Sequence, residues 1–426
     1  MTATALSYLI AARRGEIHEL ENLSHTCDLV LAISELIHCL QQERGVSNIF
    51  LALGEQRFAT LRRARMAETD AAHTTVRTWL GRTGNHTSFS GGAKLYTRIA
   101  FALHALDNLP AIRAAVTKLS CSPDDNTEHY THLVGTLLAL IFEAADVAID
   151  PDISRLLIAL FYLMQGKELA GRERATGATA FAAGHIAPEQ VQSIDYLIEV
   201  QEQAFQRFES FASHLHQEWR ALQTSLPLAD LERMRRKLLT AQGRSLDKSL
   251  SDAWLSCCST RMDGLHQVEK HLAGTLQQLC QDKTASLRRE LDGQEQGLSG
   301  LLNSHGPNGP LSPLTAFSAR LVPDSALLQT GNDGVGPQLT QVVVDMLRTQ
   351  SERLQNLTEE LSSVRASIDE RKLIERAKGV LMAHHGLNEE KAYRFLRQNA
   401  MNQNRRVVEV AQAILSLAEM LPNTKP

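Results

Sequence analysis

The sequence predicts an all-α protein. Leu, Ala, Gln, Glu and Arg, which favour helices, are plentiful among its 426 residues, whereas aromatic residues make up only 5%. Apolar residues recur at helical spacing, as in the run Leu29, Ile33, Leu36, Ile37 and Leu40. Segments rich in Gly and Pro separate these stretches. We therefore expect a helical bundle and no sandwich or barrel.

The first 302 residues contain six helical stretches in order. These are 24–80, 93–120, 127–183, 189–222, 229–242 and 246–302. Residues 303–338 then carry Gly and Pro at a density that a helix does not tolerate, so we expect a linker there. The predicted organisation is a helical domain over 1–302, this linker, and a C-terminal region over 339–426.

A heptad seam opens the C-terminal region, and a long helix is expected over 339–368. From Val343 to Ile368 apolar residues recur in alternating steps of four and three, with Gln350 as the one polar member. Such a seam fits a helix that packs on its own domain. It fits a coiled coil equally well, within one chain or between two chains. The sequence leaves both possibilities open.

Three short helices are predicted after residue 365. The first runs to about His384 and stops at Gly386, the second starts after Asn388, and the third starts after Asn402 or Asn404. Residues 365–426 hold 11 Lys and Arg against 7 Asp and Glu, whereas the rest of the chain holds 33 against 41. A basic module on an acidic body suggests a polyanion-binding output under the control of that body.

An inexact internal repeat lies in the helical domain. Residues 42–54 align with residues 172–184 at a constant offset of 130. The matched residues are Glu43 with Glu173, Arg44 with Arg174, Ala52 with Ala182, and Gly54 with Gly184. A repeat of this length suggests two related helical halves that face each other.

Each copy of the repeat places an arginine beside small residues, such as Gly45 and Ser47 next to Arg44. A buried guanidinium needs a carboxylate or a bound anion. Internal neutralisation, by Glu43 or Glu173 among others, is one interpretation. The other is a pocket for a compact planar anion, whose oxygens the guanidinium fork matches. A further basic cluster spans residues 233–237, in which we expect Arg236 to face inward.

The third helix of the C-terminal region begins with two adjacent cations, Arg405 and Arg406. Cations at a helix start oppose the helix dipole, unless an anion binds there together with the free backbone N–H groups. Arg371 and Lys378 share one helix face, and Gly379 leaves the backbone beside Lys378 accessible. These features favour contacts with nucleic-acid phosphate. A merely solvated basic surface is the alternative.

Several classes of function are not supported. The sequence lacks nucleophile-elbow, phosphate-loop and zinc-protease motifs, so we expect no enzyme. Its six cysteines are scattered and its histidines lack ligand spacing, so we expect neither a metal site nor a disulfide framework. No basic leader is present and no apolar run approaches about 18 residues, which predicts a cytoplasmic protein with no membrane span.

The C-terminal pattern closely resembles the ANTAR family of RNA-binding antiterminator domains. The residues that carry the resemblance are Arg371, Ile374, the run Ala377-Lys378-Gly379-Val380-Leu381-Met382, Glu389, Glu390, Ala392, Phe395-Leu396-Arg397, Asn404-Arg405 and Val410-Ala411. The first 300 residues resemble the NIT family of nitrate- and nitrite-sensing domains. Here the shared residues are the Gln-Glu-Arg-Gly helix at 42–45, Lys167-Glu168, Arg172-Glu173-Arg174, and Trp254 with Arg261 and Asp263.

These resemblances imply a regulator in which nitrate or nitrite binds between sensor helices. Binding would free the output domain to hold a leader mRNA hairpin and prevent a terminator from forming, as expected for nitrate assimilation genes. The implied anion ligands are Arg44, Arg174, Arg236, Arg172 and Arg261, with Gly45 and Ser47 beside them. The implied RNA contacts are Arg371, Lys378, Gly379, Arg397, Arg405 and Arg406.

The resemblance calls for no cofactor, with nitrate or nitrite as the effector, and it leaves a homodimer open. Many ANTAR proteins carry a phosphorylated receiver domain, but no such α/β pattern is present here, so ligand binding would replace phosphorylation. The alternative function is a cytoplasmic helical scaffold that binds a protein partner. A scaffold would not need the paired Glu-Arg repeat with its small neighbours.

Overall fold

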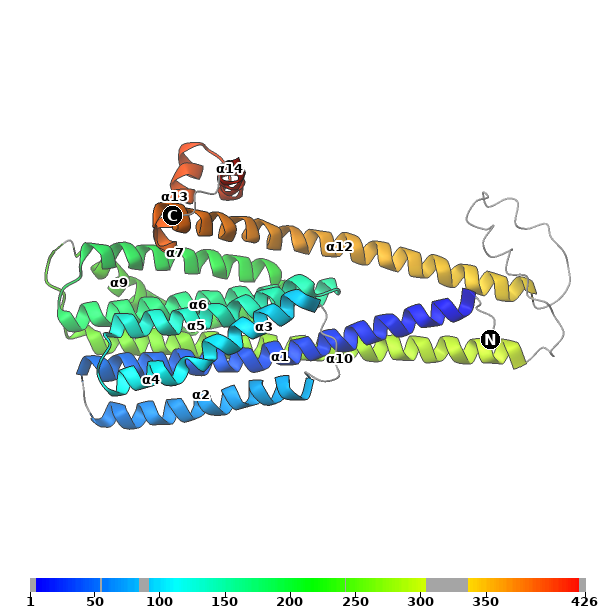
Figure 1. The fold of residues 1–426 in the computed structure, drawn as a ribbon, viewed down its shortest axis with the longest axis horizontal. Helices are drawn as coiled ribbons and strands as arrows, with labels where there is room; N and C mark the ends of the chain where they lie inside the picture. The colour runs from blue at the N-terminus through cyan, green and yellow to red at the C-terminus, as the bar shows by residue number, and fades with distance from the viewer. Residues whose placement is uncertain (1–4, 54–55, 84–91, 242, 304–335, 421–426) are drawn as a thin grey trace.

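The computed structural model describes residues 5–53, 56–83, 92–241, 243–303 and 336–420, and these residues form helices and no strand. The prediction of an all-α fold is therefore confirmed. Figure 1 shows an elongated bundle in which most helices run along the long axis. A small helical module sits on top of one end of this bundle.

The body of the molecule comprises the helices before residue 304. They are α1 (Ala5–Leu53), α2 (Gln56–Thr83), α3 (Gly92–Asp107), α4 (Leu109–Thr117), α5 (Pro123–Val147), α6 (Pro151–Ala183), α7 (Pro188–Phe211), the 3₁₀ turn η1 (Ser213–Leu215), α8 (His216–Ser225), α9 (Leu228–Leu239) and α10 (Leu250–Asn303). The C-terminal part comprises α12 (Gly336–His385), α13 (Glu389–Asn402) and α14 (Val407–Met420). The predicted linker, apart from its ends, lies outside the described residues.

Several predicted helices are divided in the structure. The stretch 127–183 breaks before Pro151, whose ring suits the first turn of a helix but not its interior. Asp150 caps the new helix, because its carboxylate accepts from the backbone N–H groups of Asp152 and Ile153 at 3.1 and 3.0 Å. Helical periodicity continues across this break, so the pattern of apolar residues did not reveal it.

The core lies between α1, α5, α6 and α10. Its fully buried residues include Leu36, Ile37, Ile141, Leu160 and Leu272. By length and composition, α1, α5 and the stretch 92–117 are apolar enough to cross a membrane. More than half of the apolar window of α1 and of α5 is buried within the bundle, whereas most of the window in the stretch 92–117 is not.

Helix α12 runs along the body, and its seam becomes more buried toward the C-terminus. Leu354 is 50% exposed, whereas Val364 and Ile368 are buried in the same core as α1. An ion pair of 3.3 Å between Arg353 and Glu290 joins α12 to α10. The C-terminal half of the seam therefore packs on its own chain, which is one of the two arrangements that the sequence allowed.

The C-terminal module, formed by the last turns of α12 with α13 and α14, has its own small core. Ala377, Leu381, Ala392, Leu396, Val410 and Leu415 are buried in it. Gly386, at φ +62°, ends α12 as predicted, because this left-handed conformation suits glycine. The side chain of Asn388 then accepts from the backbone N–H of Lys391 at 2.9 Å and starts α13.

Candidate anion site and basic docking surface

The two glutamates of the repeat are bound in the same way. Glu43 is buried in α1, and Arg113 of α4 donates to it from Nε and Nη2 at 2.7 and 2.8 Å. Glu173 is buried in α6, and Arg235 of α9 donates to it from Nε and Nη2 at 2.6 and 2.7 Å. Each half of the bundle thus neutralises its glutamate with a bidentate arginine from a short outer helix.

The arginines that follow these glutamates have different surroundings. Arg44 is 2% exposed, and it donates from Nη1 and Nη2 to the two oxygens of Glu168 at 2.5 and 3.1 Å. Its Nη1 also donates to Oγ1 of Thr131 at 3.2 Å. Gln41 donates to Glu168 at 2.9 Å and holds that carboxylate in place. The charge of Arg44 is therefore balanced from within α6.

Arg174 is partly buried next to Arg44 and, among the described residues, takes part in no ion pair. Its one hydrogen bond to another described side chain is to Oγ of Ser259, at 3.4 Å. Burial and the nearby charge of Arg44 lower the pKa of Arg174 below its ordinary value. Among the four described arginines Arg44, Arg174, Arg235 and Arg261, Arg174 is the one without an ion pair.

Two glycines let the guanidinium groups of Arg44 and Arg174 pass between α1 and α6. A Cβ added at Gly45 would lie 2.7 Å from Nη2 of Arg174, and one added at Gly171 would lie 2.9 Å from Nη2 of Arg44. Gly45 therefore has the close-approach role that the sequence indicated. Ser47 is also buried, but its hydroxyl accepts from Nε of Arg62 at 3.2 Å and is not directed at Arg174.

Arg261 lies on the other side of Glu173. Its Nη1 is 3.7 Å from Oε2 of Glu173, and its guanidinium stacks 5.5 Å from the centre of the Phe205 ring. Burial and the neighbouring Arg235 lower its pKa. Arg44, Arg174, Arg235 and Arg261 form what we call the arginine cluster. Among these four, Glu168 and Glu173 are the neutralising carboxylates from α6.

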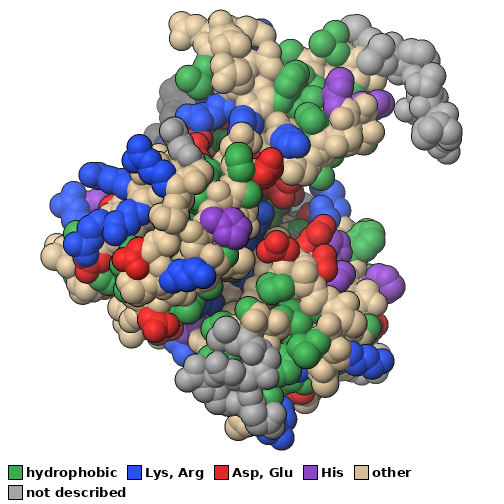
Figure 2. Space-filling model, turned by 90° about the vertical axis from the view of Figure 1, so that its left-hand side faces the viewer, with side chains coloured by type: hydrophobic (Ala, Val, Ile, Leu, Met, Phe, Trp, Pro, Cys, Tyr) green, Lys and Arg blue, Asp and Glu red, His purple; other side chains and the backbone are tan. Residues whose placement is uncertain are grey.

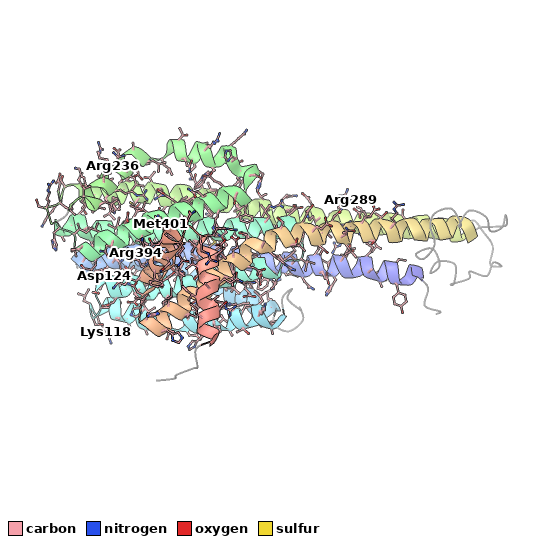
Figure 3. All side chains as sticks on the ribbon, turned by 90° about the horizontal axis from the view of Figure 1, so that it is seen from above. Lys118, Asp124, Arg236, Arg289, Arg394 and Met401 are labelled. Carbon is pink, nitrogen blue, oxygen red and sulfur yellow. The ribbon has the colours of Figure 1, made fainter. Side chains whose placement is uncertain are left out.

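The prediction that Arg236 faces inward was wrong. Its side chain is exposed, and Figure 3 shows it at the edge of the bundle. The neighbouring Arg235 is buried instead, because it lies four residues after the buried Leu231 and so shares its face of α9. A rotation of about 100° per residue turns Arg236 to the solvent.

A cavity of about 940 Å³ lies where α12 meets α3, α5 and α6. Glu168 and Thr131, the partners of Arg44, line its wall on the body, and Arg172 lines it as well. Arg371 and Lys372 line it from α12. Arg172 therefore faces the junction of the two parts of the molecule, whereas the cluster lies behind Glu168.

Arg371 anchors α12 to the body. Its guanidinium lies over three aromatic rings, 5.6, 4.5 and 5.6 Å from the centroids of Phe142, Phe161 and Tyr162. It also donates to Oε1 of Gln165 at 2.9 Å. An arginine surrounded by aromatic faces gains cation–π attraction in a largely desolvated place.

The second contact of the C-terminal module is made by α13 on α7. Arg397 forms an ion pair with Glu199, and the hydroxyl of Tyr393 donates to Oε1 of Gln203 at 2.6 Å. The Tyr393 ring meets Tyr196 edge to face, with centroids 5.9 Å apart. Figure 3 shows Arg394 and Met401, also of α13, lying over the bundle. Figure 2 shows acidic and basic side chains side by side where the upper lobe meets the body.

The remaining predicted RNA contacts differ in exposure. Lys378 is 6% exposed, and its Nζ contacts Glu375 at 3.0 Å and Glu389 at 2.8 Å. Burial by itself would lower the pKa of Lys378, but the two carboxylates raise it above its ordinary value. Arg405 and Arg406 are exposed at the start of α14 and pair with Glu409 and Glu370. No neighbouring side chain crowds Gly379.

A separate polar network connects α1, α6 and α10 next to Glu168. Lys167 and Glu269 are buried and form an ion pair, and Ser34 donates to Glu269 at 2.5 Å. His266 lies 3.3 Å from Glu269 and stacks on His38, with ring centroids 3.5 Å apart. Among the described residues no group of His, Cys, Asp or Glu is arranged to hold a metal ion.

Sequence reasoning missed the arginines that bind the repeat glutamates, Arg113 and Arg235, and the aromatic residues under Arg371. The position of Arg235 relative to Leu231 and Leu238 could have identified it as the inward arginine. Arg113 carries no comparable signal, because its partners Glu43 and Asp70 lie on other helices, far away in the sequence. The aromatic residues come from two helices that the apolar pattern joined into one.

Comparisons with known proteins agree with this architecture. Residues 35–277 match the family model of the NIT domain, described as nitrate and nitrite sensing, and residues 362–415 match that of the ANTAR domain. The chain is 30% identical over 416 residues to the nitrate regulatory protein of Klebsiella oxytoca, covering 98% of this chain and 96% of that protein. The solved structure of the NasR transcription antiterminator matches with a TM-score of 0.59 and 30% identity, covering 98% of this chain and 99% of that one.

A helical sensor joined to an ANTAR output defines a ligand-responsive regulator of transcription. The chain belongs to the NasR family of nitrate- and nitrite-sensing transcription antiterminators. Members of this family are regulators and not enzymes, as the sequence predicted, and membership decides against the scaffold alternative. The resemblances to the NIT and ANTAR families are confirmed.

Proposed function

We propose that nitrate or nitrite binds between Arg44 and Arg174, with Arg261 close by. The observation that carries this proposal is the partly buried guanidinium of Arg174, which sits beside a second arginine without a carboxylate of its own among the described residues. A buried cation without a counter-charge costs several kcal/mol. A small planar oxyanion would offset this cost, and the guanidinium fork matches its oxygens.

Glu168 links this site to the output. The carboxylate that neutralises Arg44 also lines the cavity whose other wall holds Arg371 and Lys372. An anion at Arg44 competes with Glu168 for the same guanidinium. We infer that binding shifts Glu168 and the adjoining turn of α6, which carries Gln165 and, one turn earlier, the rings of Phe161 and Tyr162 under Arg371. The contact that holds α12 then weakens.

In the docked state the body engages part of the module's basic surface, while Arg405 and Arg406 stay exposed. Arg371 and Arg397 are engaged by the body, and Lys378 is enclosed by two carboxylates. Release would expose Arg371 and Arg397 beside Arg405 and Arg406, which are exposed already, and the combined surface suits a leader mRNA hairpin. Lys378 keeps its two carboxylate partners, because both belong to the module. To move the population from 1:99 to 99:1, the anion must favour the released state by about 5.5 kcal/mol. We place this activity in the cytoplasm, where the transcript is made.

The seam of α12 offers the place for a second copy of the chain. Leu354 is exposed on it, so a homodimer would pack there.

The anion site is tested by titration calorimetry of nitrate into the full-length protein. Arg174→Ala should weaken binding about 100-fold or abolish the heat, because a hydrogen-bonded charge at the anion is lost. Arg236→Ala is the matched control, since this arginine is exposed, and should bind as the parent does. Equal affinities of the parent and Arg174→Ala would contradict the site.

Gating is tested by fluorescence anisotropy of a labelled leader hairpin. The parent should bind the hairpin more tightly when nitrate is present, and Arg174→Ala should not respond. A nitrate response that survives in Arg174→Ala would separate RNA binding from the proposed anion site.

A further inference from the structure

We propose that Tyr393 forms a stacking site for an unpaired RNA base, and that Tyr196 and Gln203 of the sensor cover this site in the docked state. The proposal rests on the proposed RNA-binding function and adds a subsite to it. Its occupant is an unpaired nucleobase in the loop or a bulge of the hairpin. Base-paired stems do not expose the base face that such a site requires.

Tyr393 belongs to the surface of α13 and not to the core of its module. The buried residues of that helix are Ala392, Leu396 and Ala400. The contacts of Tyr393 are made with the body: its hydroxyl donates to Gln203, and its ring meets Tyr196. Leu169, Leu197 and Val200 complete a small apolar cluster around it. When the module leaves, the ring of Tyr393 loses the contacts with Tyr196 and Gln203 that cover it.

Cations surround the ring on the same side of the module. Arg397 lies four residues later, one turn along α13. Arg371 and Lys378 line the same small cavity of about 80 Å³ as Tyr393. An aromatic ring with Arg371 and Arg397 nearby is an arrangement that binds single-stranded nucleic acid, because a base stacks on the ring while neighbouring phosphates meet the charges. Lys378 contributes less, since Glu375 and Glu389 of the same module pair with it. The edge-on packing of Tyr196 occupies the place of such a base.

Phe395 provides an internal comparison. It lies on α13 two residues from Tyr393, so a rotation of about 200° places it on the other side of the helix. Its side chain is 45% exposed and stacks near His385, with centroids 6.5 Å apart. The ring contact of Phe395 is thus made within its own module, and nearly half of the residue is open to solvent. A ring that contacts RNA only after release should be covered by the body in the docked state, which holds for Tyr393 and not for Phe395.

The simpler alternative is that Tyr393 serves only to dock the module. Once docking is removed, the two roles predict different hairpin affinities. Substituting a residue that only docks the module should leave the affinity unchanged, whereas substituting a residue that stacks on a base should lower it. The sensor-side variant Tyr196→Ala with Gln203→Ala removes the cover without changing the module. This full-length variant should bind the hairpin more tightly than the parent in the absence of nitrate, and it is the background for the test.

The experiment measures hairpin affinity by anisotropy in that background. Tyr393→Ala should weaken binding to a hairpin with unpaired loop bases by about 10-fold or more, within the range known for base–aromatic stacking. Tyr393→Phe should bind normally, because the ring and not the hydroxyl stacks. Tyr393→Leu, which keeps apolar bulk, should lose as much affinity as Tyr393→Ala. A fully paired duplex of the same length should show no loss in any variant.

Phe395→Ala is the matched control and should retain hairpin affinity. Unchanged binding by Tyr393→Ala and Tyr393→Leu would overturn the proposal and leave Tyr393 as a docking residue. An equal loss in Tyr393→Phe, or a larger loss in Phe395→Ala, would also overturn it. If the uncovered background itself binds no hairpin, the proposed RNA-binding function fails, and the stacking site fails with it.

Discussion

Arg44 and Arg174 lie side by side where α1 crosses α6, and Glu168 is the carboxylate that contacts one of them. A group that neutralises a binding arginine in the empty state also competes with the ligand. The strength of the Arg44–Glu168 pair therefore sets both the affinity for the anion and the energy available for a response. This reasoning leads to two predictions about single side chains.

Glu168→Gln should raise the affinity for nitrate by about 10-fold, since the anion no longer displaces a carboxylate from Arg44. The same change should lower the free energy of unfolding by about 3 kcal/mol, because Arg44 remains buried without a counter-charge. Calorimetry and urea unfolding measure the two effects. Glu202→Gln, at an exposed position of α7, should change neither. Weaker nitrate binding in Glu168→Gln would show that this carboxylate does not compete.

Gly45→Ala should weaken nitrate binding by about 10-fold. The new methyl group would lie 2.7 Å from Nη2 of Arg174 and would push the guanidinium out of its place. Gly15→Ala is the matched control in the same helix, because no atom lies within 4 Å of an added Cβ there. Calorimetry measures the nitrate affinity of both variants. Equal affinities of Gly45→Ala and Gly15→Ala would mean that nitrate binding does not depend on the present position of the Arg174 guanidinium.

Helices are the scale at which the sequence was most informative. Apolar spacing and the glycine at 386 located the helices of the C-terminal module, since that pattern is local. The breaks at Pro151 and near Ala212 were missed, because apolar residues continue across them. The inward arginine is Arg235 and not Arg236, because Arg235 lies four residues after Leu231 and three before Leu238 and so shares their buried face. The partners of the repeat glutamates come from distant helices, and no local pattern encodes such contacts.

The contact between α6 and α12 yields a prediction about elements. Phe161→Leu should raise hairpin binding in the absence of nitrate by about 3- to 10-fold, because the ring nearest to Arg371 contributes about 1 kcal/mol of cation–π attraction. Anisotropy measures the change. Phe208→Leu is the control, since this buried ring of α7 packs on Trp219, and its effect on nitrate-free hairpin binding should be absent. Equal binding in both variants would mean that the aromatic contact does not hold α12.

The stability of the whole molecule should depend on pH through the network beside the site. Burial, Lys167 and His266 lower the pKa of His38 from 6.5 to about 3. Burial by itself would raise the pKa of Glu269, but Lys167, His266 and Ser34 lower it from 4.5 to about 2. For both groups the unfolded chain takes up a proton at a higher pH than the folded chain. Stability is therefore lost as pH falls, from about 6.5 for His38 and from about 4.5 for Glu269.

Between pH 6.5 and 5 His38 should lower the free energy of unfolding by about 1 kcal/mol per pH unit, and His73, whose pKa burial also lowers, adds to this slope. His38→Gln should flatten this slope in urea unfolding experiments, whereas His104→Gln, at an exposed position of α3, should not. An identical slope in the parent and in His38→Gln would show that another group controls acid stability.

Helix α12 is unbroken from Gly336 to His385, so its 50 residues form a rod of about 75 Å. Val364 and Ile368 press this rod against the body about 25 Å from the end that carries α13 and α14. A tilt of α12 about the contact at Val364 and Ile368 would therefore move α12 as one straight helix. A slight tilt there is magnified at the tip, and the absence of a hinge within α12 means that little of the motion is lost to bending.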